Sequence, residues 1–302
     1  MRRLYSALLL LASLKDGIEA IPSPACFSLY KHARKQDEII YLFAHGLRSS
    51  QNQGLTLFSN HYNKHSWIIQ QPFMLFDFPD AHEKKGYCRD EHVNLGQEED
   101  IERMKLAYEY AIKKLPQSEG FVLTGISRGA ATCINFVAMH QPERVKAVVI
   151  ESPFDTIKSV VNHLLNRFNL SWMPYSSDIG MMLIDTKFER LDTQGIFPVD
   201  LIAHIPGHVP ILIVGSHSDD VVPIASVRKL YTALKRTGHA HVYLLELSAG
   251  RHGRLIKGEQ GPLYAACVHA FYERYGLPHV PELVEYGREI LAQCQPEVVG
   301  FW

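Results

Sequence analysis

Six short apolar segments recur along the chain, and helical patterns separate them. This alternation limits the fold more than any other feature of the sequence. Most of the segments are continuously apolar, which is typical of strands that are covered on both faces. Strand–helix–strand repetition implies right-handed crossovers, so we predict an α/β fold with a mainly parallel sheet and helices on both faces. The segments lie at 38–46, 73–80, 121–127, 146–152, 209–216 and 241–248.

The clearest helical pattern covers residues 97–115. Acidic residues occupy its first turn and lysines its last turn, which suits the helix dipole. One face of this helix is apolar and carries Ile101, Met104, Tyr108, Ala111 and Leu115. Further helices are predicted at 127–145, 224–238, 262–276 and 281–294.

Residues 154–206 interrupt the alternation of strands and helices because they contain no clear strand. The segment is dense in Leu and Met and includes Trp172. Since it lies between two predicted strands, we interpret it as a small helical cap over the carboxyl edge of the sheet. Together with the rest of 21–302 it is predicted to form a single domain.

A serine at position 127 stands in the pattern Gly125-Ile126-Ser127-Arg128-Gly129, between a predicted strand and a predicted helix. In that context G-x-S-x-G is typical of a nucleophile elbow. The turn is so tight that the residues two before and two after the serine approach each other's backbone, which explains both glycines. It also lifts the Ser127 hydroxyl to the carboxyl edge of the sheet, above a helix N-terminus that favours a developing anion.

A serine hydroxyl needs a base, and the base needs an acid that orients it. Downstream of the serine, Asp219 and Asp220 follow one predicted strand, and His252 follows the next in a loop flanked by glycines. Each group would lie just past the carboxyl end of a strand, on the same edge as Ser127. We therefore predict that Ser127, one of the two aspartates and His252 are the catalytic residues.

Two backbone N–H groups are expected to bind the oxyanion. His45 and Gly46 end the first apolar segment, and Gly46 lets the chain turn sharply, so that the N–H of Leu47 can point toward Ser127. The second donor would be the N–H of Arg128. Its guanidinium has two alternative roles: it helps to bind an acidic substrate, or it points to solvent from the helix.

With these landmarks in order, the chain resembles the α/β-hydrolase superfamily from about residue 38 to 276. It is similar to the esterase, acylaminoacyl-peptidase and serine-aminopeptidase-like branches, and this resemblance implies a serine hydrolase. In that superfamily the acid commonly stands in a G-x-x-D-x-x-V-P pattern. Counting back from the Val-Pro pair favours Asp219 over Asp220, although Gly215 lies one residue earlier than the pattern wants. The short region before the first apolar segment implies that the first strands of the family are missing or irregular.

The N-terminus predicts export. Arg2 and Arg3 precede an apolar run that extends from Leu4 to Leu14, and charged residues follow it. These are the parts of a secretory signal peptide, which we predict over residues 1–20, with cleavage after Ala20 and a secreted or periplasmic location. The alternative is an amphipathic helix that packs on a cytoplasmic protein.

The five cysteines show no C-x-x-C and no zinc-ligand spacing. Cys26 and Cys88 are a candidate disulfide in an exported protein. The histidines of HYNKH, at 61–65, have a metal-like i, i+4 spacing. No helical pattern fixes them on one face, so we interpret them as part of a solvated loop and predict no metal site.

The sequence therefore predicts cleavage of a carboxylic ester, thioester or amide through an acyl-enzyme on Ser127. The expected substrate is a small-molecule or peptide acyl compound, and no metal or organic cofactor is required. The alternatives are acyl transfer by the same residues and a non-catalytic binding protein that kept the fold. A formal net charge of -1 gives no electrostatic reason to expect nucleic acid or an anionic membrane as partner. No later segment reads as a transmembrane helix.

Overall fold

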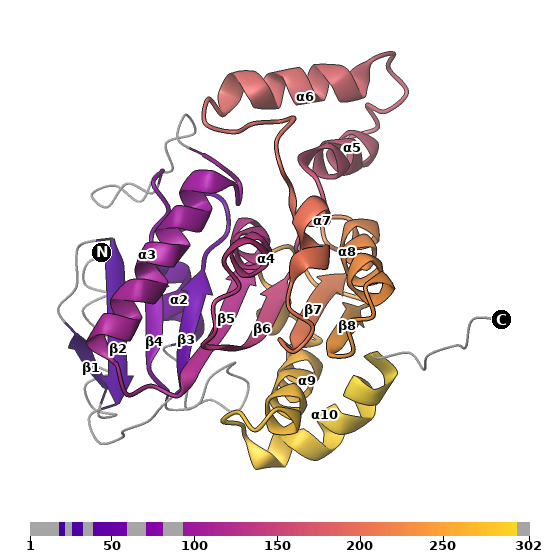
Figure 1. Ribbon diagram of the computed structural model, residues 1–302. Coiled ribbons are helices and arrows are strands. Elements are labelled where there is room, and N and C mark those ends of the chain that lie inside the picture. The colour runs from indigo at the N-terminus through magenta and orange to yellow at the C-terminus, as the bar shows by residue number, and fades with distance from the viewer. Residues whose placement is uncertain (1–17, 22–25, 33–38, 59–70, 81–92, 295–302) are drawn as a thin grey trace, which may run out of the picture.

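A twisted sheet with helices on both faces forms the body of the protein (Figure 1). The computed structural model describes residues 18–21, 26–32, 39–58, 71–80 and 93–294. The strands lie in the order β1-β2-β4-β3-β5-β6-β7-β8. Their bounds are β1 (Ile18–Ile21), β2 (Phe27–His32), β3 (Ile39–Ala44), β4 (Phe73–Phe76), β5 (Gly120–Ile126), β6 (Val145–Glu151), β7 (Ile211–Ser216) and β8 (Val242–Leu247).

The six strands from β4 to β8 run parallel, as the sequence predicted. The expectation that the first strands are missing or irregular is wrong. Strands β1 and β2 pair antiparallel with each other, and β2 pairs antiparallel with β4, with Phe27 opposite Phe76. These strands are only four and six residues long, so they carry too little periodic pattern to be recognised from the sequence.

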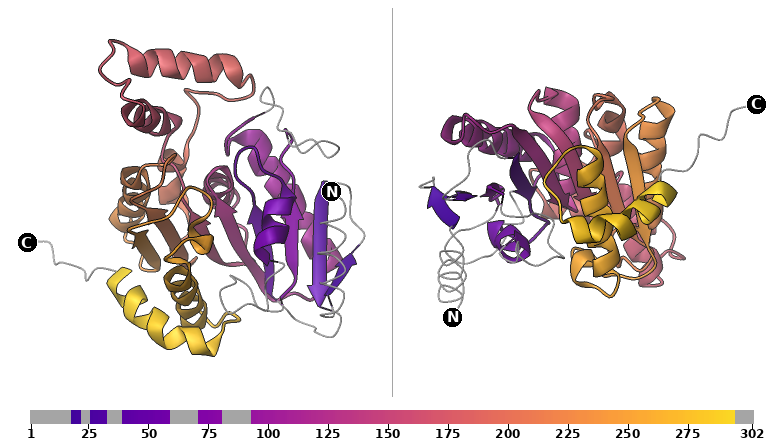
Figure 2. Two further views of the ribbon diagram at one scale, coloured as in Figure 1. Left: turned by 180° about the vertical axis from the view of Figure 1, so that it is seen from behind. Right: turned by 90° about the horizontal axis from the view of Figure 1, so that it is seen from below.

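Helices cover both faces of the sheet, and each face has its own apolar core (Figure 2). Successive residues of β3 belong to opposite cores, because side chains alternate along a strand: Leu42 packs on one face and Phe43 on the other. The longer helices are α2 (Gln51–Phe58), α3 (Glu98–Lys114), α4 (Arg128–His140), α5 (Ile157–Arg167), α6 (Ser176–Lys187), α8 (Ile224–Arg236), α9 (Gly261–Arg274) and α10 (Pro281–Cys294). Helices α3, α4 and α8 pack on the first face, and α2, α9 and α10 pack on the second.

The predicted helix at 97–115 is α3, and its apolar face is buried at Ile101, Met104, Tyr108 and Ala111. Leu115 follows the end of the helix and is only partly buried. The apolar face packs on the sheet beside α4, so the 3.6-residue periodicity predicted both the helix and its orientation.

A helical insertion separates β6 from β7. Helices α5 and α6 stand beyond the carboxyl ends of the parallel strands (Figure 1), where the sequence predicted a cap. The chain then returns through α7 (Pro198–Leu201) and the short helix η2 (Ile202–His204), which pack on α4 and α8. The insertion therefore combines two outer helices with a return segment that belongs to the packed body.

The predicted signal peptide lies largely in residues 1–17, outside the described part of the chain. Its expected cleavage point, after Ala20, falls within β1. Export therefore stays a prediction, and processing there would divide this edge strand. Within the described ranges, the structure contains no helix with the length and apolarity needed to cross a bilayer.

Candidate active site

Ser127 occupies a strained turn between β5 and α4. Its backbone has φ 56° and ψ -114°, a conformation that non-glycine residues rarely adopt. The neighbouring strand supports this turn, because the Ser127 N–H donates a hydrogen bond of 2.9 Å to the carbonyl oxygen of Glu151. A sharp strand-to-helix turn with a strained serine is the geometry of a nucleophile elbow.

The two glycines that flank the serine are required by close approach, but for different neighbours. A Cβ at Gly125 would lie 2.5 Å from the carbonyl oxygen of Gly129. A Cβ at Gly129 would overlap the carbonyl oxygen of Ala44 in β3. The sequence explained the first glycine correctly. The second is demanded by the adjacent strand, which no pattern around the serine could reveal.

Asp219 and His252 meet at the carboxyl edge of the sheet, after β7 and β8. The Nδ1 atom of His252 lies 3.0 and 2.9 Å from the two carboxylate oxygens of Asp219. Asp220 instead accepts a hydrogen bond from the main-chain N–H of His252, at 3.3 Å. The structure thus brings together the imidazole and the aspartate that the family pattern favoured, and it gives Asp220 a contact to the backbone of the same residue.

The carboxylate of Asp219 is held in its ionised form. Burial alone raises its pKa, but hydrogen bonds from His252, Ser152 and the main-chain N–H of Val221 lower the pKa below its ordinary value. The Ser152 hydroxyl donates at 2.7 Å and the Val221 N–H at 2.9 Å. An ionised carboxylate with its oxygens fixed in this way can orient the imidazole and stabilise its protonated form.

The loop that carries His252 lies against the serine turn. A Cβ added at Gly253 would stand 3.7 Å from Cγ2 of Ile126, the residue before Ser127. Ser127 and His252 themselves share no hydrogen bond among those of the described chain. Catalytic hydrogen bonds are often long until substrate binds, so this separation is compatible with a serine–histidine pair.

The turn after β3 brings Gly46, the residue before Leu47, close to the serine. A Cβ at Gly46 would stand 3.8 Å from the Cβ of Ser127. The Gly46 N–H donates to the side chain of Gln53 at 3.0 Å, which holds the turn in place. Leu47 and Arg128, the two expected oxyanion donors, therefore flank Ser127 from two elements, and as the first residue of α4 Arg128 has no intrahelical acceptor for its N–H.

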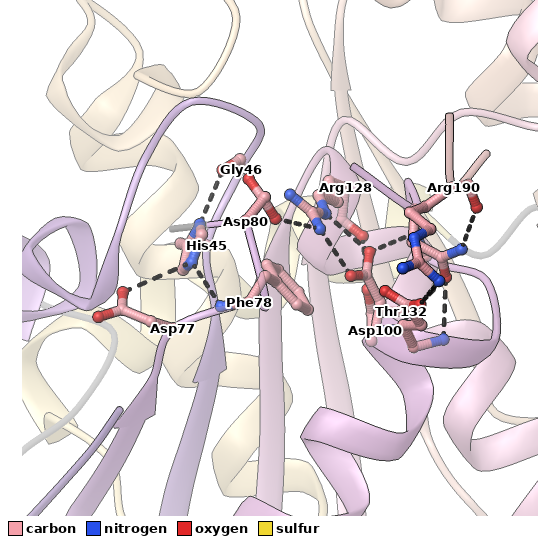
Figure 3. A network of polar contacts seen from close by, with 12 residues as sticks. His45, Gly46, Asp77, Phe78, Asp80, Asp100, Arg128, Thr132 and Arg190 are labelled. Carbon is pink, nitrogen blue, oxygen red and sulfur yellow. Dashed lines mark hydrogen bonds and ion pairs between the residues drawn. The ribbon is translucent and has the colours of Figure 1, made fainter. Parts of the chain in front are cut away.

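His45 is a structural residue of this turn. It is fully buried, and burial lowers its pKa to about 4, so the imidazole is neutral. Its Nδ1 donates to the Gly46 carbonyl oxygen at 2.8 Å, and its Nε2 accepts from the Phe78 N–H at 3.3 Å (Figure 3). The main-chain partners determine this tautomer, because the Gly46 carbonyl can only accept a hydrogen bond and the Phe78 N–H can only donate one.

Both expected roles of the Arg128 guanidinium are wrong. The side chain is completely buried and neither binds substrate nor reaches solvent. It forms two hydrogen bonds to Asp100 in α3, of 2.7 and 2.6 Å, lies 2.5 Å from Asp80, and stacks on the ring of Phe78 (Figure 3). Two carboxylates, on α3 and after β4, neutralise the charge. They are 28 and 48 residues away in sequence, so local reasoning could not find them.

Sequence reasoning missed two residues that support the site. Glu151, at the end of β6, is fully buried, and its side chain accepts a hydrogen bond from the Leu255 N–H at 3.2 Å. A charged residue at the end of an apolar segment was a signal that could have marked it. Gln53 holds the turn at Gly46, and nothing in its sequence context distinguishes it from an exposed helix residue.

Other histidines and cysteines take no part in the Asp219–His252 pair or lie outside the described ranges. His217 pairs with Glu246 at 2.9 Å on the surface, and His239 is buried. The HYNKH segment and Cys88 are outside the described residues, so the metal-site interpretation and the pairing of Cys26 stay predictions. Within the described chain, no three His, Cys, Asp or Glu side chains gather in a metal-binding arrangement.

Comparison with protein families and solved structures gives a consistent result. The model of the prolyl oligopeptidase family matches residues 90–276. An esterase of Pyrococcus furiosus superposes with a TM-score of 0.58 and 18% identity, over 82% of this chain and 87% of that chain. Comparison with curated protein sequences found no match.

Two further structures extend the likeness. The acylaminoacyl peptidase of Pyrococcus horikoshii gives a TM-score of 0.62 at 15% identity, over 92% of this chain and 45% of that chain. This chain thus corresponds to less than half the length of that peptidase. A membrane phospholipase A described as a bacterial virulence factor gives a TM-score of 0.55 at 14% identity, over 91% and 99% of the two chains. These likenesses establish the α/β-hydrolase fold.

Proposed function

Because the chain belongs to the prolyl oligopeptidase family and is a serine hydrolase of the α/β-hydrolase fold, we propose that it cleaves a carboxylic ester, thioester or amide through an acyl-enzyme on Ser127. The observation that carries this proposal is the contact of His252 with both carboxylate oxygens of Asp219, on the sheet edge that also holds the strained serine.

Acylation begins when the Oγ of Ser127 attacks the substrate carbonyl carbon and Nε2 of His252 takes the hydroxyl proton. Asp219 holds the Nδ1–H of the imidazole and stabilises its positive charge. The N–H groups of Leu47 and Arg128 bind the oxyanion of the tetrahedral intermediate, and each such donor contributes about 10²–10³ in rate. The intermediate collapses as the bond to the leaving group breaks, and His252 returns the proton to the departing alcohol, thiol or amine.

Deacylation repeats these steps with water as nucleophile. His252 takes a proton from water as its oxygen attacks the acyl carbon. The second tetrahedral intermediate then releases a carboxylic acid, and the proton returns to the Oγ of Ser127. These steps balance without a metal or an organic cofactor.

An apolar acyl group suits the surroundings of the site best. Helix α5 lies against the loop of the acid, since Nε2 of His163 is 3.2 Å from the carbonyl oxygen of Asp219. The insertion that begins with α5 exposes a group of large apolar side chains on its outer parts. They are Phe168, Leu170, Trp172, Tyr175, Ile179, Met182 and Leu183. Exposed apolar surface on an insertion that contacts the loop of the acid favours an apolar ligand over a charged one.

A substrate panel tests the proposal. p-Nitrophenyl esters of graded chain length would be compared with aminoacyl p-nitroanilides, using the wild type, Ser127→Ala and the matched control Ser171→Ala. We expect Ser127→Ala to lose at least about 10⁴-fold in kcat and the control, an exposed serine of the insertion, to keep wild-type activity. A pre-steady-state burst of p-nitrophenol would report the acyl-enzyme. Turnover that survives Ser127→Ala unchanged would reject the proposal.

A further inference from the structure

Glu151 is a buried carboxyl that the proposed mechanism does not use, yet it contacts both halves of the site. It is the last residue of β6, opposite Ile126 in the sheet, and none of its surface is exposed. Its carbonyl oxygen accepts the Ser127 N–H at 2.9 Å. Its carboxylate oxygen Oε1 accepts the Leu255 N–H at 3.2 Å. One residue therefore touches the serine turn through its backbone and the histidine loop through its side chain.

Leu255 is the anchor of the loop that carries His252. Its side chain is buried and packs against Gly250, where an added Cβ would lie 2.6 Å from Cδ2 of Leu255. Between these two residues the chain turns tightly, and the Arg254 N–H donates to the carbonyl oxygen of Arg251 at 3.1 Å. Since only two residues separate His252 from Leu255, a hydrogen bond that holds the Leu255 N–H also restricts where the imidazole can lie.

The charged and titratable groups that face Glu151 come from three elements. His252 lies on the loop after β8, Asp219 on the loop after β7, and the hydroxyl of Tyr264 approaches from α9. Burial raises the pKa of Glu151 to about 7, although the Leu255 N–H and His252 oppose this rise.

We propose that Glu151 is a positioning residue that fixes the separation between Ser127 and His252. The inference rests on the proposed function, because it assumes that these two residues carry out the reaction. Asp219 orients the imidazole through its Nδ1 atom, whereas Glu151 holds the loop through the Leu255 N–H and ties it to the serine turn.

Two variants test the hydrogen bond that Glu151 accepts from the Leu255 N–H. Glu151→Gln keeps an acceptor for the Leu255 N–H but cannot ionise. Glu151→Leu removes the acceptor at similar volume and leaves a buried N–H without a partner. Val149→Ala is the matched control, since Val149 is fully buried on the same face of β6 and does not contact the loop. Melting temperatures of all three identify any loss that comes from unfolding.

We expect Glu151→Leu to lower kcat by about 10- to 100-fold with little change in KM, because a misplaced base slows chemistry rather than binding. Glu151→Gln should recover most of this loss, because its side-chain oxygen can still accept the Leu255 N–H. If Glu151→Leu keeps kcat within about threefold of Val149→Ala, or if Glu151→Gln loses as much kcat as Glu151→Leu, the inference is wrong.

Failure of this inference is distinguishable from failure of the proposed function. The Ser127→Ala variant reports the function, because its activity does not depend on what Glu151 does. Loss of turnover in Ser127→Ala together with wild-type behaviour in both Glu151 variants would overturn the role of Glu151 alone. Full turnover in Ser127→Ala would overturn the function, and the inference would fall with it.

Discussion

The guanidinium of Arg128 and the carboxylate of Asp100 face each other through two parallel hydrogen bonds, of 2.7 and 2.6 Å, without exposure to solvent (Figure 3). Arg128 directly follows the proposed nucleophile, and Asp100 lies in the first turn of α3. The pair therefore ties the N-terminus of α4, where an oxyanion would bind, to a second helix. Asp100 also accepts a hydrogen bond of 2.6 Å from the main-chain N–H of Gly96.

Removing the guanidinium should strongly destabilise the fold. Arg128→Met leaves two buried carboxylates without their cation, and breaking a buried pair in this way costs about 3–5 kcal/mol. Arg190→Met is the control, because Arg190 pairs with Glu99 at 3.3 Å on the surface and such pairs contribute about 0–1 kcal/mol. Urea unfolding measures both. Similar losses in the two variants would contradict the structural role of the buried network.

The two adjacent aspartates should differ sharply in activity assays. Asp219→Asn keeps the shape of the side chain but removes the charge that orients His252, so kcat should fall by about 10³–10⁴-fold. Asp220→Asn should cost less than about tenfold, since Asp220 reaches only the main chain of His252. Steady-state kinetics on one p-nitrophenyl ester decides between them. Equal losses would mean that the acid has been misassigned.

The raised pKa of Glu151 predicts how stability depends on pH. Its folded-state pKa is about 7, against 4.5 for the free side chain, so the folded protein binds the proton more tightly. The stability that protonated Glu151 adds to the folded state is fully present below about pH 4.5. It is lost as pH rises to about 7, at up to about 1.4 kcal/mol per pH unit. We therefore expect the unfolding free energy of the wild type to fall relative to that of Glu151→Gln when both are measured from pH 5 to 8. Parallel curves would show that Glu151 ionises normally.

The glycines of the serine turn should not tolerate alanine. Gly129→Ala would drive a Cβ into the carbonyl oxygen of Ala44, which belongs to a central strand and cannot move aside. We expect a loss of about 3 kcal/mol or more, seen as a large drop in Tm. Gly207→Ala is the control, because an added Cβ there meets nothing within 4 Å. A neutral Gly129→Ala would remove the physical explanation for the G-x-S-x-G pattern.

The sequence predicted those parts of the fold whose causes are local. Continuous apolar runs identified the six parallel strands, and the face of α3 follows from its periodicity. The order of strands and polar residues also predicted that Asp219 and His252 would share an edge with Ser127. What escaped prediction depends on contacts between distant segments. Arg128 reads as a surface residue until Asp80 and Asp100 are placed beside it.

The residues that support the site could not be predicted from the sequence, for the same reason. Glu151 was visible as the end of an apolar run, but its hydrogen bond to Leu255 joins residues 104 positions apart. The edge strand β1 is held by its pairing with β2, and β2 by its pairing with β4, rather than by patterns of their own. Local periodicity therefore predicts elements, whereas tertiary packing decides which polar side chains become partners.

The central claim is that Ser127 is a nucleophile activated by His252. Fluorophosphonate labelling of the folded protein, followed by peptide mass spectrometry, tests it most directly. We expect one adduct in the wild type, on the peptide that contains Ser127. Ser127→Ala should not be labelled, and His252→Gln should be labelled slowly. A wild type that does not react, or an adduct on another serine, would contradict the central claim.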